Sequence, residues 1–224
     1  MAKEHIEIHL RQISQIEMDA DNLDPIDLIC HAIDLCSNPC YDFHHCAYLY
    51  LTCRYMCPNK IVETGVWVGL CTAFMLKALE KTGGCLYSVD LPNVEYETDD
   101  GKTHRDVLPS KSKIGHGVPE RLKANWELGL GDSREKLPKL LQSIGKIDIF
   151  HHDSMHTYDL MTFEYETVWP YLRHDGLLLS QCADWNNAFK DFCHRHSADY
   201  QIYKGMGIAR KSGSGSIGSL HVRT

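Results

Sequence analysis

Residues 60–80, KIVETGVWVGLCTAFMLKALE, decide the fold. The apolar run 61–62 ends on an acid, Glu63, and Gly65 and Gly69 follow before apolar residues recur at helical spacing. This order predicts a strand, a tight turn and a helix. Glycine permits a sharp turn or the close approach of a ligand. The helix would also bring free N–H groups and the positive end of its dipole to the edge of the strand.

The next segment, CLYSVD at 85–90, strengthens this interpretation. The spacing from Gly65 to Gly69 is weak alone, because it matches neither the Gly-x-Gly-x-x-Gly pattern of dinucleotide folds nor the end of a phosphate loop. A packing turn in an ordinary α/β domain would also explain it. Residues 85–90, however, predict a second strand ending on Asp90. That is about 20 residues after the turn, where nucleotide-binding β-α-β units place a carboxylate for the ribose.

The composition excludes several classes of protein. A length of 224 residues predicts one domain with an additional segment, at roughly 150 residues per domain. The formal net charge of -7 argues against a general nucleic-acid-binding protein, which would carry a basic face. No run reaches the ~18 apolar residues of a membrane span, and the start, MAKEHIEIHLRQ, lacks the apolar core of a signal peptide. We therefore expect a cytoplasmic protein without nucleic-acid or membrane partners.

Ten cysteines and fourteen histidines raise the question of a metal. Six cysteines fall between Cys30 and Cys57, close to three histidines. A structural zinc site would use such residues, but there is no Cys-x-x-Cys pair, and the pairs 36/40 and 53/57 stand at helical spacing. Reduced thiols packed on helices explain the same pattern, and disulfides are not expected without an export signal. The identity of any metal ligand stays open.

Residues 1–58 are expected to form an N-terminal helical cap. Helices are predicted over 3–18, over 24–35 after the Asp24-Pro25 start signal, and over 41–56. We expect this cap to cover the mouth of the following domain. Its aromatic residues are expected in a core rather than around a substrate; they are Tyr41, Phe43, Tyr48, Tyr50 and Tyr55.

The core domain is expected over residues 59–211. Further strands are predicted at 126–130, 147–152, 177–181, 200–204 and 207–210, with helices between them, among them one over 158–172. Such alternation predicts a parallel sheet with right-handed crossovers, and ligands bind beyond the carboxyl ends of its strands. The long polar segment 91–119 is either a lid over the site or a mobile surface insertion. Residues 212–224 are rich in Gly and Ser and are expected to form a flexible tail, either native or a cloning remnant.

Polar residues gather where the predicted strands end, and the pattern resembles a known family. The strings VETGVWVGLCTAFMLKALE, LYSVDLP, LGDSREKLP, HDSMHTYDLMTFEYETVWPYLRHDGLLLS and DWNNAF follow one another in the chain. They resemble class I S-adenosylmethionine-dependent methyltransferases over residues 60–211, in particular a subgroup related to the small-molecule O-methyltransferases of macrolide sugars and catechols. The resemblance implies a Rossmann-like, doubly wound α/β fold with a mostly parallel seven-stranded sheet and an N-terminal helical cap.

The same resemblance implies which residues bind S-adenosylmethionine, whose product is S-adenosylhomocysteine. Glu63, Thr64 and the turn from Gly65 to Gly69 would face the methionine part of this cofactor. Asp90 would accept hydrogen bonds from both ribose hydroxyls, since one carboxylate can accept two donors.

The resemblance assigns the adenine and the reacting methyl group to later strand ends. Asp132 and Ser133 would frame the adenine, although this pair is also typical of a helix N-cap. Asp153 would lie between the cofactor and a small-molecule acceptor, methylated at a hydroxyl. Methyl transfer is an in-line displacement, so the protein aligns the reactants and removes the hydroxyl proton. His156 is the candidate base because its ordinary pKa is about 6.5; a structural histidine is the alternative.

The end of the fifth core strand departs from metal-dependent relatives, which carry an acidic pair there that holds Mg²⁺. Here Gln181 and Cys182 take those positions, and a thiol is a poor ligand for Mg²⁺, so this ion is doubtful. Asp184 could help Asp153 hold a metal only if the turn differs. Cys182 could bind a softer metal or react as a thiol, although a plain substitution is the simpler explanation.

Other functions stay open besides methyl transfer. They are a metal-dependent O-methyltransferase that uses Asp153 and Asp184, a non-catalytic protein that keeps the cofactor fold, and an NAD-dependent oxidoreductase, which the glycine spacing disfavours. The sequence decides neither the acceptor nor the oligomeric state, and a homo-oligomer is possible.

Overall fold

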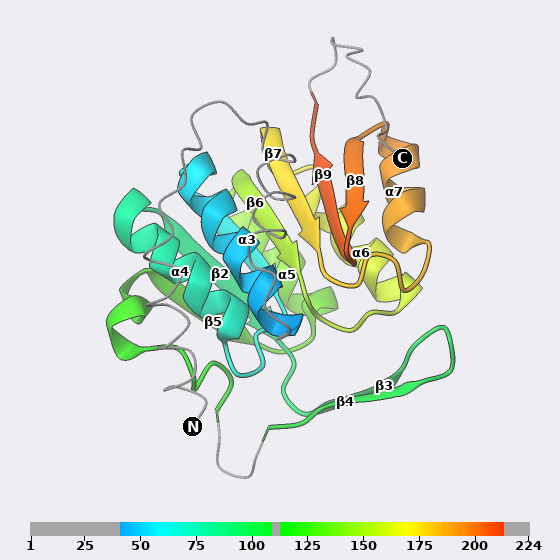
Figure 1. Ribbon diagram of the computed structural model, residues 1–224, viewed down its shortest axis with the longest axis horizontal. Helices are drawn as coiled ribbons and strands as arrows, with labels where there is room; N and C mark the ends of the chain where they lie inside the picture. Colours follow the sequence, from blue (N-terminus) through cyan, green and yellow to red (C-terminus); the bar gives the residue numbers. More distant parts are fainter. Residues whose placement is uncertain (1–40, 109–112, 213–224) are drawn as a thin grey trace.

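The computed structural model describes residues 41–108 and 113–212. They form a seven-stranded sheet with helices on both faces and a separate hairpin (Figure 1). The sheet contains β1 (Lys60–Thr64), β2 (Cys85–Asp90), β5 (Trp126–Leu130), β6 (Ile147–His152), β7 (Leu172–Ser180), β8 (Asp199–Tyr203) and β9 (Met206–Arg210). The helices are α3 (Tyr41–Met56), α4 (Leu70–Thr82), the 3-10 helix η1 (Glu120–Asn125), α5 (Ser133–Ile144), α6 (Tyr158–Val168) and α7 (Ala188–His196). The hairpin pairs β3 (Val94–Glu97) with β4 (Thr103–Asp106).

The strand order is β5-β2-β1-β6-β7-β9-β8. Neighbours from β5 to β7 pair in parallel, whereas β9 is antiparallel to both β7 and β8. The predicted fold class, a mostly parallel seven-stranded α/β sheet, is therefore confirmed. The chain runs from β1 outward to β2 and β5, and then returns to β6 on the other side of β1. Ligands in such sheets bind where the order reverses, beyond the carboxyl ends of the strands.

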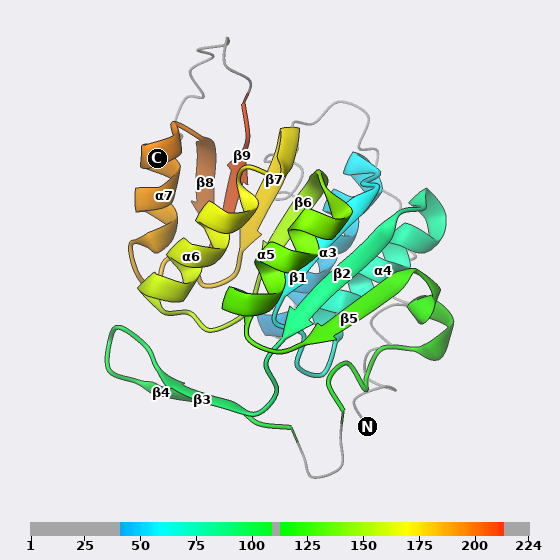
Figure 2. The ribbon, with the colours of Figure 1, turned by 180° about the vertical axis from the view of Figure 1, so that it is seen from behind.

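Each face of the sheet carries its own helical layer (Figures 1 and 2). Helices α3 and α4 cover one face, and α5, α6 and α7 cover the other. Phe74 and Leu79 of α4 are buried in one apolar cluster, and Leu137, Tyr165 and Phe192 are buried in the other. Within the described ranges, none of the helices combines the length and the apolar character that a membrane crossing requires.

Helix α3 belongs to the layer on the sheet. Its Cys46 and Cys53 are fully buried in the same cluster as α4, and Tyr48 Oη donates a hydrogen bond to Met206 Sδ of β9 at 3.0 Å. The apolar side chains of α3 are thus removed from water against the sheet, and His45 of the same helix borders the cavity; a cap over the mouth stays a prediction. The two earlier predicted helices lie outside the described residues, and the domain boundaries stay a prediction.

The aromatic residues of α3 follow the expectation where they are described. Tyr48 and Tyr50 are 0% and 2% exposed, and only Tyr55 reaches the surface. The side chains of Tyr41 and Phe43 lie outside the described part of the structure. The prediction is therefore confirmed for Tyr48 and Tyr50, whereas Tyr55 lies outside the core.

The long polar segment after β2 contains a hairpin that the sequence analysis missed. In the β3–β4 ladder Val94 lies opposite Asp106 and Glu97 opposite Thr103, and Arg105 Nε lies 2.7 Å from Glu95 Oε2. The alternation of the string VEYE is a strand signal, but it is short and charged, so it did not stand out from the surrounding loop.

Strand β7 also begins earlier than predicted, at Leu172 instead of residue 177, and α6 accordingly ends at Val168. Residues 173–175 are exposed. Their polar side chains hide the first half of the strand from an analysis based on apolar runs.

Candidate functional site

A cavity of about 420 Å³ opens where the strand order reverses. Its wall combines parts of α3 and α4, the β1–α4 turn, the end of β2, the hairpin, the β5–α5 turn and the segments after β6 and β7. The residues that border the cavity include Gly65, Val66, Trp67, Cys71, Asp90, Tyr96, His104, Asp132, Ser133, Asp153, His156, Gln181 and Trp185. The wall thus unites Gly65, Asp90, Asp132, Ser133 and Asp153 of the predicted cofactor-binding set with His156. It does not include Glu63, Thr64 or Gly69.

Asp90 ends β2 and holds the turn that follows β1. Its Oδ2 accepts hydrogen bonds from the backbone N–H groups of Val66 at 2.6 Å and Trp67 at 2.9 Å. Hydrogen bonds to an ionised carboxylate are stronger than those between neutral groups. Among the described residues, only these two donors reach the carboxylate. One oxygen therefore fixes the turn, and the other is available to a ligand in the cavity.

The two glycines of the turn serve different backbone contacts. At Gly65, where φ is +84°, an added Cβ would stand 2.1 Å from the carbonyl oxygen of Asp153. The turn therefore lies directly against the end of β6. At Gly69, where φ is +91°, a Cβ would meet Cγ2 of Val118 at 2.5 Å. Both glycines thus serve packing, and Gly65 also borders the cavity; close approach of a ligand at Gly65 stays a prediction.

Glu63 and Thr64 lie beneath the cavity and are fully buried. Glu63 Oε2 accepts hydrogen bonds from Thr72 Oγ1 at 2.9 Å and from Ser88 Oγ at 2.7 Å. The Thr64 hydroxyl donates to Glu164 Oε2 at 2.5 Å. The side chains expected to face the methionine part of a cofactor thus face the protein interior. Any effect of theirs on a ligand would act through the backbone turn that they support.

Asp132 and Ser133 stand at the start of α5. Asp132 Oδ1 accepts a hydrogen bond from the backbone N–H of Arg134 at 2.8 Å, which is an N-cap contact. Both residues also border the cavity. The N-cap interpretation is confirmed, and contact with an adenine stays a prediction.

A buried carboxylate that the sequence analysis missed joins the strand ends below the cavity. Glu164 of α6 is 0% exposed; besides Thr64, it accepts hydrogen bonds from His152 Nδ1 at 2.7 Å and Ser154 Oγ at 2.9 Å. Burial raises the pKa of Glu164, but the neighbouring His152 and the hydrogen-bond donors outweigh it, and the pKa is lowered overall. Because an acid on an amphipathic helix usually faces water, its role could not be identified from the sequence.

His156 lies in the cavity wall in a buried position. Neither of its ring nitrogens makes a hydrogen bond to the described residues, and Nε2 is 3.9 Å from Asp153 Oδ1. Burial, followed by the neighbouring histidines His152 and His104, lowers the pKa of His156 to about 3. The expectation of an ordinary pKa is therefore wrong. A neutral imidazole with so low a pKa is a weak base, although it can still accept a hydrogen bond from a ligand.

After β7, Gln181 stands at a position that the resemblance assigns to one acid of the metal-binding pair in metal-dependent relatives. Gln181 Nε2 donates a hydrogen bond to Asp153 Oδ2 at 2.8 Å. Burial and the nearby Asp153 and Asp184 raise the pKa of the Cys182 thiol to about 12, so this thiol is neutral and unreactive at pH 7. Asp184 is exposed and does not border the cavity. The turn therefore does not bring Asp184 into a shared site with Asp153.

The comparison with known proteins agrees with this geometry. The sequence matches the family model described as a methyltransferase domain over residues 62–181. The chain belongs to this methyltransferase family. No curated protein sequence matches the chain significantly.

Solved structures of methyltransferases share the fold at low sequence identity. The methyltransferase PaMTH1 of Podospora anserina, bound to S-adenosylhomocysteine, gives a TM-score of 0.58 at 12% identity, over 94% of this chain and 95% of its own. The O-methyltransferase TomG of Streptomyces achromogenes, in complex with S-adenosylmethionine, gives 0.55 at 14%, over 95% and 100%. An O-methyltransferase of Bacillus cereus, in complex with S-adenosylhomocysteine, gives 0.53 at 13%, over 92% and 100%.

An aromatic rim borders the cavity of this methyltransferase. Tyr96 and His104 of the hairpin stack with ring centroids 5.7 Å apart. The ring of Trp185 is 5.1 Å from those of His104 and His156, and Trp185 is 46% exposed. This rim could not be predicted from the sequence, because the hairpin and the segment after β7 come together only in the folded chain.

The tip of the hairpin is fastened to the start of α6 and to the segment before α7. Asp99 Oδ2 accepts hydrogen bonds from the backbone N–H of Tyr158 at 2.8 Å and from Asn186 Nδ2 at 3.0 Å. This arrangement is compatible with the lid hypothesis, which stays a prediction.

Proposed function

We propose that this chain transfers a methyl group from S-adenosylmethionine to a hydroxyl of a small-molecule acceptor. The proposal rests on the position of the Asp90 carboxylate. Its carboxylate ends β2 inside the cavity, fixes the glycine turn with one oxygen and leaves the other available. A ribose diol supplies the hydrogen-bond donors that such an oxygen would accept.

The remaining wall residues fit the rest of the cofactor. Gly65 and Asp153 both border the cavity, and their backbones lie against each other, where the methionine part is expected. Asp132 and Ser133 border the side on which the adenine would lie. The solved structures of similar fold from Podospora anserina, Bacillus cereus and Streptomyces achromogenes hold S-adenosylhomocysteine or S-adenosylmethionine, which supports the same cofactor here.

Alignment of the reactants is the main task of such a site. The acceptor oxygen attacks the methyl carbon in line with the departing sulfur, and alignment can supply up to about 7–11 kcal/mol of the barrier reduction. Asp153 and His156 stay the proposed catalytic residues. With a pKa of about 3, His156 is better suited to accept a hydrogen bond from the acceptor hydroxyl than to carry away its proton.

The aromatic rim favours an acceptor with a flat or apolar face. Tyr96, His104 and Trp185 present ring surfaces beside His156, and such rings bind planar groups by stacking. Oxygen as the methylated atom is supported by the similar folds of two O-methyltransferases. A cytoplasmic location fits the free state of every cysteine among residues 41–108 and 113–212.

Calorimetric titration with S-adenosylmethionine and S-adenosylhomocysteine tests the cofactor, with NAD as the control. We expect micromolar binding of the first two ligands and none of NAD. Transfer of a labelled methyl group to a panel of phenols, catechols and sugars then tests the reaction. Cofactor binding without transfer to any acceptor would favour the non-catalytic alternative, and absence of cofactor binding would contradict the proposal.

A further inference from the structure

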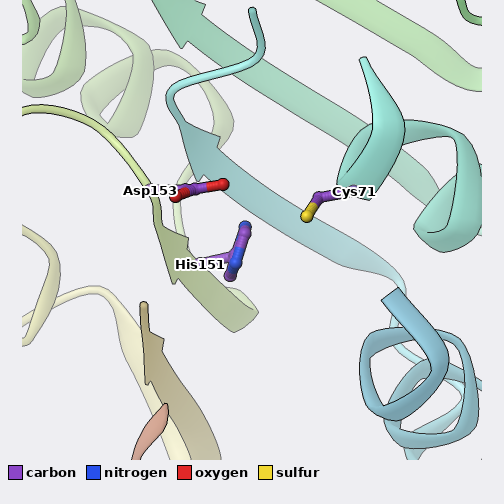
Figure 3. A group of neighbouring side chains, drawn as sticks. All are labelled: Cys71, His151 and Asp153. Carbon is purple, nitrogen blue, oxygen red and sulfur yellow. The ribbon is translucent and has the colours of Figure 1, made fainter. Parts of the chain in front are cut away.

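Three side chains with metal-binding chemistry meet beside the cavity (Figure 3). They are Cys71 of α4, His151 of β6 and Asp153 just after β6. Each offers a donor atom, and these atoms lie within 4.8 Å of one another. Cys71 and Asp153 border the cavity, whereas His151 is 0% exposed. The cluster therefore lies between the cavity and the buried centre of the sheet.

Buried polar atoms of His151 and of the neighbouring Glu63 lack hydrogen-bond partners among the described residues. Neither ring nitrogen of His151 has a hydrogen bond to the described residues, and the same is true of Glu63 Oε1, which is 3.7 Å from His151 Nδ1. Nearly all buried polar groups in proteins are paired, and an unpaired one costs about 1–3 kcal/mol. A bound ion would give the imidazole of His151, which lies beside the Cys71 thiol and the Asp153 carboxylate, the partner that it lacks.

We propose that Cys71, His151 and Asp153 bind a divalent transition-metal ion of the zinc class. The donor set selects the ion, because Mg²⁺ and Ca²⁺ take oxygen ligands, whereas Zn²⁺ accepts sulfur, nitrogen and oxygen together in tetrahedral geometry. Sulfur, nitrogen and oxygen atoms bound to one tetrahedral Zn²⁺ at the usual bond lengths lie about 3.5 Å from one another. The three side chains would therefore move inward by roughly 1 Å at most, which rotations of the side chains can supply.

Gln181 occupies the side of this cluster that faces the cavity. Its Nε2 lies 3.3 Å from Cys71 Sγ and 2.8 Å from Asp153 Oδ2. A half-turn of the amide would present Oε1 in the same place as a fourth ligand. The thiol of Cys46 lies 3.9 Å from Cys71 Sγ and would orient that sulfur. The site thus uses the carboxylate after β6 but takes its other donors from α4 and from the interior of β6.

The ion would lie beside the reacting groups if the proposed methyl transfer is correct, and this role rests on that proposed function. An acceptor hydroxyl that replaces Gln181 at the fourth position would form an oxygen–metal bond and release its proton to solvent. The resulting alkoxide or phenolate would take the methyl group from the sulfonium, leaving neutral S-adenosylhomocysteine. A metal lowers the pKa of a bound hydroxyl, which would supply the proton removal to which His156 is poorly suited.

Cobalt titration of the metal-free protein tests the site, because Co²⁺ bound to a thiolate shows a charge-transfer absorption band. We expect one equivalent of Co²⁺ with this band in the wild type. The band should be absent in Cys71→Ser, and the affinity for Zn²⁺ should fall by about 100-fold or more. Cys57→Ser is the matched control, since Cys57 is an exposed free thiol outside the cluster, and it should keep the band.

A persistent band in Cys71→Ser, or a wild type that binds no stoichiometric metal, would overturn the proposal. X-ray absorption on the zinc-loaded wild type gives an answer without any variant. A shell with one sulfur and otherwise nitrogen and oxygen supports the site, and a shell without sulfur refutes it. S-adenosylhomocysteine binding is measured on each sample. Circular dichroism reports whether Cys71→Ser is folded, and S-adenosylhomocysteine binding by the wild type separates failure of the metal site from failure of the proposed function.

Discussion

Asp90→Ala tests the two roles of the Asp90 carboxylate, which are to hold the turn after β1 and to bind the ribose of the cofactor. The substitution removes the acceptor for the backbone N–H groups of Val66 and Trp67, which donate at 2.6 and 2.9 Å. A hydrogen bond to a charged group contributes about 1.5–3 kcal/mol, so the free energy of unfolding should fall by about 3–6 kcal/mol. Loss of one charged hydrogen bond to the ribose should raise the Kd for S-adenosylhomocysteine about 10- to 100-fold.

Denaturant unfolding and calorimetric titration measure the two effects independently. Asp90→Asn is the matched control, because its side-chain oxygen can still accept from the turn. We expect its stability to be closer to that of the wild type, while its affinity for S-adenosylhomocysteine falls. The reasoning fails if a folded Asp90→Ala protein binds this ligand as tightly as the wild type, since Asp90 would then serve the turn alone.

Three further substitutions test other parts of the site. The folded pKa of His156, about 3, lies below its unfolded value of about 6.5, so stability should fall as the pH falls from 6.5 toward 3, by up to about 1.4 kcal/mol per pH unit. His156→Gln should remove this slope in denaturant unfolding at pH 4 to 7, and an unchanged slope would contradict the assignment. Gly65→Ala would place a Cβ 2.1 Å from the Asp153 carbonyl oxygen and should prevent stable folding, whereas Gly101→Ala has a similar φ but no atom within 4 Å and should cost only about 1–2 kcal/mol; equal melting temperatures would refute this argument. Asp99→Ala should release the hairpin tip and speed proteolysis of residues 91–119, with cofactor slowing cleavage of the wild type if the hairpin is a lid.

The parallel sheet could be predicted because its central strands are buried on both faces. Such strands appear in the sequence as short apolar runs, and β1, β2 and β6 each show one that ends in polar residues. The strand segments that could not be predicted from the sequence are polar and exposed. The first half of β7 and the hairpin carry charged side chains, and their pairing becomes visible only in three dimensions.

The candidate site could also be predicted only in part from the sequence. Asp90, Asp132 and Asp153 could be predicted because each follows a strand whose end is visible in the sequence, and all three border the cavity. Glu63 lies near the end of β1, yet its carboxylate faces Thr72 and Ser88, since period-2 alternation does not say which end residue faces a ligand. The burial that lowers the pKa of His156 depends on neighbours from other elements, which no local pattern records.

The position of α3 has a consequence for the order in which the chain can fold during synthesis. Tyr48 and its partner Met206 are 158 residues apart in sequence, so nearly the whole described chain must leave the ribosome before this contact can form. Contacts of such long range close late and slow folding. Until β9 joins the sheet, part of the apolar face of α3 stays open to water or to chaperones. A nascent chain arrested before residue 206 should therefore expose this helix to protease, although the helix itself is made early.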